Sequence, residues 1–495
     1  MTRLLVLTSI VLMIALLVGL AITGERDPWT GTTEFRGHKH TSRELTLGNG
    51  EVVTVVRGSI KVPEVRNKDD SRQINIGYAA VAGNAPAGAI PIVLLAGGPG
   101  GSHIRNLDRP WVKERIALFR QLGDVVMVDL RGIHSSTPQF ELSGVDDPWR
   151  NVRSESELLQ LLEDAGAAGR AQLQASGFNL SGYVVTEAAA DVVAIADHLT
   201  YPQINLQGTS FGSHFTFAVV RYHPERVNRF MVTGVEGYDH TFDDGHAVRT
   251  ALAKIAVEAE SVWAGAHNAA DPLTAFENLL AKSAANPAQT YGVSPHEWLM
   301  VQLNGDMMGF GYNLSSRAGM HSWPADTAQL IAGSGSWRAN LLRWFSGFFV
   351  GSDASEAAVG LFDCTSWISS ARAQVLQHNA PPNFPNNLQT MQAICAGWDV
   401  QPLPESFQLG EVSMVPGLFV HGTYDVSTPY QNALDILPLF PNGQLVTVEG
   451  GSHNVFSEML AERPEFAAEV IGWFQGGPPP PNTTLPPLKF APLTD

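Results

Sequence analysis

Short apolar runs that alternate with helical patterns constrain the fold of this 495-residue chain more than any other feature. The runs lie at residues 90–95, 124–129, 203–206, 229–233, 415–420 and 445–448. Apolar strands that are separated by helices are typical of a parallel sheet with helices on both faces. Alternating runs at residues 51–56 and 74–78 predict further strands with one solvated face. The sequence therefore predicts an α/β fold with a mostly parallel sheet.

The alternation of strands and helices stops between residues 241 and 410, where helical patterns and loops occur without clear strands. A helical block inside a parallel sheet predicts a cap domain. We therefore expect a core formed by residues 25–240 and 411–477, with a mainly helical cap at residues 241–410. Residues 478–495 are rich in proline, and we expect an irregular tail that carries no chemistry.

The N-terminus has the pattern of a targeting segment. Residues 4–23 carry no charge and follow Arg3. The run is longer than the ~7–15 residues of a usual signal core, which favours a membrane anchor, whereas the small residues Gly19 and Ala21, on either side of Leu20, offer a cleavage site. We expect residues 1–24 to be a signal peptide or an anchor, and the remainder to be secreted, periplasmic or anchored outside the cytoplasm.

Composition excludes several classes of protein. The 31 basic and 48 acidic residues give a formal net charge of −17, which repels nucleic-acid backbones. Hydrophobic residues make up 44% of the chain, enough for a large core. The two cysteines cannot form a cysteine-cluster metal site, and we expect no metal or other cofactor. In an oxidising compartment Cys364 and Cys395 would form a disulfide; two buried free thiols are the alternative.

The sequence GTSFG at residues 208–212 predicts a serine nucleophile. A strand precedes it and a helical segment at residues 215–222 follows, which is the context of a turn that exposes the serine. The two glycines permit the close backbone approach that such a turn requires. The alternative is an ordinary turn that contains a serine.

A serine nucleophile needs a base, and the base needs an orienting acid. In a sheet with this kind of turn the order along the chain is serine, acid, histidine. Asp425 follows the predicted strand at residues 415–420, and His453 is the only histidine beyond it. The alternatives are a turn-capping role for Asp425 and a solvated His453.

A glycine-rich loop, GGPGG at residues 97–101, follows the first buried run. Its exposed N–H groups, with Gly98 as the candidate, would form an oxyanion hole together with the N–H of Phe211. A phosphate-binding loop is excluded because no G-K-[ST] follows and the spacing is not G-x-G-x-x-G. A plain turn is the alternative.

Together these motifs resemble the prolyl aminopeptidase and tripeptidyl aminopeptidase branch of the α/β-hydrolases. The matching segments are GSIKVP at 58–63, AGGPG at 96–100, DLRGIHSS at 129–136, GTSFGS at 208–213, HGTYD at 421–425 and GGSH at 450–453. The resemblance spans residues 50 to 475, with the cap similar only in character. Ala96 stands where the family has histidine, and His134 stands where it has glycine, so the turn at His134 is expected to differ.

The resemblance implies an α/β-hydrolase fold and the removal of residues from a free peptide N-terminus. It also implies acidic side chains that hold the substrate amine. We nominate Glu236, just past the carboxyl end of the strand after the serine turn, where ligands gather in open parallel sheets. A structural carboxylate at the cap hinge is the alternative. We expect Asp239, Asp243 and Asp244 to be solvated.

The sequence thus predicts an exported serine hydrolase that acts on short peptides or small acyl substrates. Ser210, His453 and Asp425 would form the catalytic triad. A carboxylic-ester hydrolase with the same triad is the first alternative, because both reactions use the same acyl chemistry. A third hypothesis is a non-catalytic binding protein on this fold, and the intact set of triad residues argues against it. We expect membrane contact only through the N-terminal segment, and the sequence leaves the oligomeric state open.

Overall fold

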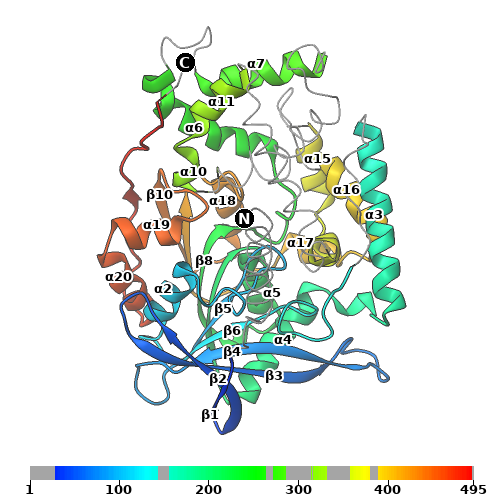
Figure 1. Ribbon diagram of the computed structural model, residues 1–495, viewed down its shortest axis with the longest axis vertical. Helices are drawn as coiled ribbons and strands as arrows, with labels where there is room; N and C mark the ends of the chain where they lie inside the picture. Colours follow the sequence, from blue (N-terminus) through cyan, green and yellow to red (C-terminus); the bar gives the residue numbers. More distant parts are fainter. Residues whose placement is uncertain are drawn as a thin grey trace, which may run out of the picture.

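The computed structural model describes residues 28–142, 155–263, 271–285, 314, 316–331, 357–378 and 388–492. Within these residues the core is an 11-stranded sheet with the strand order β1-β2-β3-β4-β6-β5-β7-β8-β9-β10-β11 (Figure 1). The predicted targeting segment at residues 1–24 lies outside the described residues. No helix among the described residues is long and apolar enough to cross a membrane.

The first part of the sheet is antiparallel. It contains β1 (Gly31–Phe35), β2 (His38–Thr46), β3 (Val52–Pro63) and β4 (Gln73–Val81), each paired with the next. β4 also pairs antiparallel with β6 (Val125–Val128). Residues 52–55 of β3 alternate between exposed and buried positions, as predicted for residues 51–56. The solvated face predicted at residues 74–78 was wrong: β4 is buried from residue 76 onward, and a Cβ on Gly77 would lie 2.1 Å from Ser135 Oγ, which covers it.

From β6 onward all neighbouring strands are parallel. These strands are β5 (Ile92–Leu95), β7 (Ile204–Ser210), β8 (Val227–Val235), β9 (Gly417–Gly422), β10 (Gly443–Glu449) and β11 (Thr483–Thr484). Every residue of β5, β6 and β9 is buried, which explains the continuous apolar sequences of β5 and β6. The prediction of a mostly parallel sheet is therefore confirmed.

The side chains of the central strands point alternately into two hydrophobic clusters. Val93 and Leu95 belong to one cluster, and Ile92 and Leu94 belong to the other. The first cluster includes residues of α4 (Val185–His198) and α5 (Phe211–Tyr222). The second includes residues of α2 (Pro110–Phe119), α19 (Val455–Glu462) and α20 (Glu465–Phe474). Helices thus cover both faces of the sheet.

The described residues between β8 and β9 form helices and no strand. They are α6 (Gly245–Trp263), α7 (Pro272–Ala285), α10 (Arg317–Met320), α11 (Trp323–Ile331), a π-helical turn (Val359–Asp363), α14 (Cys364–Ser366), α15 (Ser370–His378), α16 (Leu388–Trp398) and α17 (Glu405–Leu409). In Figure 1 these helices occupy the upper part and one side of the molecule, away from β1–β4. We call this insertion the cap. The remaining elements are 3-10 turns at Leu180–Gly182, Pro224–Arg226 and Leu437–Leu439, and α18 (Tyr430–Ile436).

Helix α3 (Glu155–Ala175) precedes α4 in the sequence but packs against α16 of the cap. Glycines permit the close contact: a Cβ on Gly397 would lie 2.0 Å from the carbonyl oxygen of Glu163, and one on Gly166 would lie 2.9 Å from that of Ile394. α3 comes from the stretch that we assigned to the core by sequence, residues 25–240.

The two cysteines link α14 to α16 within the cap. The predicted disulfide between Cys364 and Cys395 is confirmed, with their Cα atoms 5.2 Å apart. Both residues are buried in the same hydrophobic cluster as α3, so the bond joins segments that already pack together.

The proline-rich tail is more ordered than its composition predicts. Thr483 and Thr484 form β11, which extends the sheet beyond β10. Leu485 is buried in the second hydrophobic cluster. Proline lacks a backbone N–H but is tolerated at the edge of a sheet, so a proline-rich segment can still continue one there.

Candidate active site

Ser210 ends β7 and precedes the first residue of α5. Its backbone has φ +59° and ψ −133°, a conformation that costs a non-glycine residue about 1–3 kcal/mol. A Cβ on Gly208 would lie 2.0 Å from the carbonyl oxygen of Gly212, and one on Gly212 would lie 2.3 Å from that of Leu95. Both glycines are therefore required for the sharp turn that presents Ser210.

The glycine loop at residues 97–101 lies directly against this turn. A Cβ on Gly97 would lie 2.9 Å from the Cβ of Ser210. Gly98 adopts φ +128°, and the loop is closed by a hydrogen bond of 3.0 Å from Gly101 N to the Gly97 carbonyl. Phe211 is the first residue of α5, so its N–H has no partner within the helix. The two predicted oxyanion-hole residues thus lie on segments that flank Ser210.

Asp425 and His453 form a direct pair. His453 Nδ1 donates to Asp425 Oδ2 at 2.9 Å. The backbone N–H groups of Ser427 and Thr428 donate to Oδ1 at 2.9 and 2.8 Å, and the Thr428 hydroxyl donates to Oδ2 at 2.9 Å. Asp425 is fully buried, whereas the His453 side chain is 13% exposed. The carboxylate is therefore held rigidly, and the ring keeps an accessible edge.

β8 brings the histidine to the serine turn. Ser210 is in register with Val235 of β8. A Cβ on the preceding Gly234 would lie 2.7 Å from His453 Cε1, so the imidazole ring packs against the backbone beside Ser210. No hydrogen bond joins the Ser210 hydroxyl to His453 among the described residues; in free enzymes this bond is often long and shortens only when substrate binds.

The local charges perturb both members of this pair. Burial alone lowers the pKa of His453, but the charge and hydrogen bond of Asp425, with smaller effects of Asp243 and Glu458, raise it above its usual value. Burial raises the pKa of Asp425, but the charge and hydrogen bond of His453 outweigh burial and lower it. The carboxylate thus stays ionised and stabilises a protonated imidazole.

A group of acidic side chains lies close to the pair. Burial, followed by the charges of Asp363 and Asp243, raises the pKa of Glu236 well above its usual range. Burial and the charge of Asp243 do the same to Asp363. Burial raises the pKa of Asp243 to about 8, although Arg372 opposes this shift. We call Glu236, Asp243 and Asp363 the acidic cluster.

The expectation that the three aspartates after Glu236 are solvated was wrong. Asp239 accepts hydrogen bonds of 2.5 Å from the N–H and the hydroxyl of Ser369 in the cap. Asp244 is buried and lies 3.9 Å from Arg372, and Asp243 belongs to the acidic cluster. The segment after β8 runs beneath the cap, which buries Asp244 and leaves Asp239 and Asp243 only partly exposed.

Asp363 was missed because no local motif marks it. It lies on the π-helical turn before Cys364, and its Oδ1 is buried without a hydrogen-bond partner among the described residues. Its proximity to Glu236 depends on how the cap packs, which no short sequence pattern encodes. The adjacent Cys364 was the only feature of the sequence that drew attention to this segment.

The two departures from the family pattern have different outcomes. His134 keeps a left-handed backbone, with φ +42°, so it adopts the conformation in which glycine is usual. The backbone at this position is therefore the one that a glycine would adopt, although the residue differs. Ala96 lies beside the glycine loop: a Cβ on Gly101 would lie 3.6 Å from the Cβ of Ala96.

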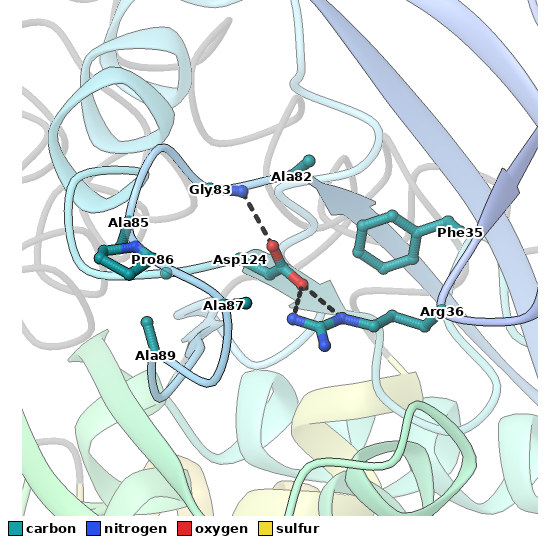
Figure 2. Close-up of a pocket in the computed structure, with 10 residues that line it drawn as sticks. Phe35, Arg36, Ala82, Gly83, Ala85, Pro86, Ala87, Ala89 and Asp124 are labelled. Atoms are coloured by element: carbon teal, nitrogen blue, oxygen red, sulfur yellow. Dashed lines mark hydrogen bonds and ion pairs between the residues drawn. The ribbon is translucent and has the colours of Figure 1, made fainter.

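A cavity of about 380 Å³ lies at the opposite ends of the strands (Figure 2). Half of its lining residues are alanine or proline, and its charged side chains bond to one another. Arg36 forms a 2.6 Å ion pair with Asp124, which also accepts a hydrogen bond of 2.8 Å from Gly83 N. We assign no function to this cavity. No group of three or more His, Cys, Asp or Glu side chains in the described part of the chain could hold a metal ion.

Two family models match the chain. Residues 90–290 match the model described as alpha/beta hydrolase fold, and residues 380–462 match the model described as TAP-like protein. The first match contains Ser210, and the second contains Asp425 and His453. The chain therefore has the α/β-hydrolase fold, and the two matches support the resemblance to the tripeptidyl-aminopeptidase-like branch.

No curated protein matches the chain in sequence. Among solved structures, the α/β-hydrolase enzyme MGS-M2 from a Medee basin deep-sea metagenome library is 13% identical, with 82% of this chain and 95% of that chain covered and a TM-score of 0.34. A probable hydrolytic enzyme from Pseudomonas aeruginosa PAO1 is 12% identical (84% and 93% covered, TM-score 0.37). A thermophilic esterase from Thermogutta terrifontis is 14% identical (85% and 98% covered, TM-score 0.35).

Proposed function

We propose that this hydrolase is an exported serine aminopeptidase that releases residues from the free N-terminus of short peptides. Ser210 would be the nucleophile, His453 the general base and acid, and Asp425 the residue that orients the imidazole. The exposed serine turn beside the glycine loop and the buried Asp425–His453 pair support these roles.

The reaction follows the two steps of acyl transfer. Ser210 Oγ attacks the scissile carbonyl carbon while His453 Nε2 accepts the hydroxyl proton. The N–H groups of Gly98 and Phe211 stabilise the oxyanion of the tetrahedral intermediate. His453 then protonates the leaving amine as the C–N bond breaks. Water, deprotonated by the same histidine, attacks the acyl-enzyme, and the proton returns to Ser210 as the acid product leaves.

The acidic cluster is the observation that carries the choice of substrate. The charges that raise the pKa values of Glu236 and Asp363 are those of neighbouring carboxylates, and Arg372 opposes the shift at Asp243. A protonated α-amine placed there would form charge-assisted hydrogen bonds in a low-dielectric site. The cluster therefore favours a substrate with a free N-terminus, and the neighbouring cap would admit short peptides rather than folded proteins.

A panel of chromogenic substrates tests this proposal. It contains aminoacyl and tripeptidyl anilides, their N-acetylated forms, and short acyl esters. Acetylation should reduce kcat/KM by a factor corresponding to about 2–5 kcal/mol, because it removes the positive charge and the N–H donors that the acidic cluster would bind. Equal rates on free and blocked anilides, with faster ester cleavage, would instead identify a carboxylic-ester hydrolase.

Two variants locate the amine site. Glu236→Gln should lower kcat/KM on free-amine anilides and have little effect on esters. Glu64→Gln is the matched control, because Glu64 is a buried glutamate that is already bonded to Arg72 and Tyr183. The control should leave the ratio between free and blocked substrates unchanged. An unchanged ratio in Glu236→Gln would exclude Glu236 as the amine ligand.

The Cys364–Cys395 disulfide supports export, because such bonds form and persist in oxidising compartments. Cell fractionation with an antibody against the catalytic domain tests this part of the proposal. We expect the protein outside the cytoplasm, either released or membrane-bound. Recovery in the cytoplasm would contradict export.

A further inference from the structure

Residues 482–491, which we call the C-terminal strap, leave the sheet edge and reach the cap. At the sheet edge, Asn482 accepts a hydrogen bond of 2.9 Å from Thr447 N, and Leu485 N donates to the Glu449 carbonyl at 2.9 Å. Figure 1 shows this red segment running along the side of the molecule from β10 toward α6 and α11. The strap thus spans the two parts of the protein.

The far end of the strap is bound to the cap. Leu488 N donates to Glu258 Oε2 on α6 at 2.8 Å, and Ala491 N donates to the His321 carbonyl at 2.9 Å. The side chains of Leu488 and Phe490 pack against a hydrophobic cluster formed by α6, α7, α10 and α11. Polar and apolar contacts together fix this end of the strap.

Arg317 of α10 connects the strap to the loop that carries His453. Its guanidinium donates to the carbonyls of Gly450 and Pro486. Its backbone N–H donates to Glu458 Oε1 at 3.3 Å. Glu458 also accepts from the N–H and hydroxyl of Ser452 at 2.8 and 2.5 Å. The loop at residues 450–453 is therefore held at both ends.

Glu258 makes the equivalent connection to the loop that carries Asp425. Its Oε1 accepts a hydrogen bond of 2.6 Å from the hydroxyl of Tyr424, while its Oε2 binds the strap. Tyr424 and Val426, on either side of Asp425, belong to the same cap cluster as Leu488 and Phe490. The strap and cap thus meet both catalytic loops at one place.

We propose that Arg317 is a positioning residue, which together with the C-terminal strap and Glu258 holds the loops of Asp425 and His453 in register beneath the cap. The proposal rests on the triad of the proposed function. Gly450 has φ +75° and is followed by another glycine, so this loop has little conformational restriction of its own. The planar guanidinium presents its donors in a fixed fork that holds the two carbonyls in one geometry, whereas the ammonium of a lysine is a compact charge on a flexible chain.

Arg317→Ala tests the proposal in the full-length protein. Because small misplacements of reacting groups are costly, we expect the rate constant for labelling by a fluorophosphonate, and kcat, to fall by about 10- to 100-fold. KM should change by less than about threefold, because Arg317 does not contact the acidic cluster. Arg317→Lys, which can keep one of the two hydrogen bonds, should recover part of the loss.

Arg226→Ala is the matched control. Arg226 also donates to two backbone carbonyls, of Tyr201 and Pro202, but it lies in the 3-10 turn before β8, at the end of that strand away from the catalytic loops. The control should label at the wild-type rate. A similar fall in both variants would indicate a general loss of structure and would overturn the proposal.

The acid limb of the rate–pH profile separates positioning from simple destabilisation. The charged groups that face His453 are Asp425 and His421, Asp243 before α6, and Glu458 on α19. A displaced loop would weaken the contact with Asp425, so the acid limb of Arg317→Ala should move to lower pH. A lower rate with an unmoved limb would contradict a positioning role.

The outcomes distinguish this proposal from the proposed function. Absence of labelling in the wild-type enzyme would refute the triad itself. A labelled wild type together with an Arg317→Ala variant of equal rate would refute the positioning role alone. If Arg317→Ala does not fold, Glu258→Gln decides: it replaces one of the two carboxylate oxygens that accept from Tyr424 and Leu488 by an NH₂ group, and it should lower kcat without raising KM. Wild-type kinetics in that variant would overturn the proposal.

Discussion

Replacing Asp425 with asparagine should change the tautomer of His453. The N–H groups of Ser427 and Thr428 both donate to Oδ1, so the single oxygen of asparagine would occupy that position. Its NH₂ group would then face His453 Nδ1, which now donates to Oδ2 at 2.9 Å. Two donors cannot pair, so the imidazole would carry its proton on Nε2 and could not accept the proton of Ser210.

We expect Asp425→Asn to lower kcat by about 10⁴-fold, which corresponds to roughly 5.5 kcal/mol of transition-state stabilisation. The pKa of His453 should also fall, because the charge of Asp425 is what raises it against the effect of burial. Steady-state kinetics from pH 5 to 9, with circular dichroism to verify folding, provide the measurement. A folded variant with less than about a tenfold loss would refute this reasoning.

Three further predictions concern stability. Burial raises the pKa of Asp243 to about 8, so the stabilisation by its bound proton is complete below the unfolded pKa and is lost as pH rises through 8. The unfolding free energy of Asp243→Asn should therefore increase relative to that of the wild type by about 1–3 kcal/mol between pH 5 and 9. A difference in urea unfolding that does not change with pH would contradict this. Replacing Cys364 and Cys395 by serine should cost about 2–4 kcal/mol, measured by the same unfolding experiment, and wild-type stability would show that the bond is dispensable. Gly212→Ala places a Cβ 2.3 Å from the carbonyl oxygen of Leu95, so we expect little folded protein in solubility and thermal-melting assays; a wild-type melting temperature would refute the tight turn.

The sheet and the candidate triad could be predicted because their signals are local. Buried parallel strands require continuous apolar residues, as in β5 and β6. The turn around Ser210 requires glycines at fixed positions, and the chain order then restricts the candidates for the acid and the histidine. Each of these features is determined by a few adjacent residues.

The remaining features depend on contacts between distant segments. Asp363 reaches Glu236 only through the packing of the cap, and α3 joins the cap through a close contact with α16. The strap was expected to be irregular because it is rich in proline, which lacks the backbone N–H that regular structure needs. Proline content does not indicate whether side chains such as Leu485 are buried. Composition and spacing carry no information about such long-range packing.

The central claim is that Ser210 is a nucleophile activated by His453. Mass spectrometry of the intact protein after reaction with a fluorophosphonate, followed by peptide mapping, tests this claim most directly. We predict a single covalent adduct on the peptide that contains Ser210, and no adduct in Ser210→Ala. An unmodified wild-type protein, or an adduct on another residue that persists in Ser210→Ala, would contradict the account.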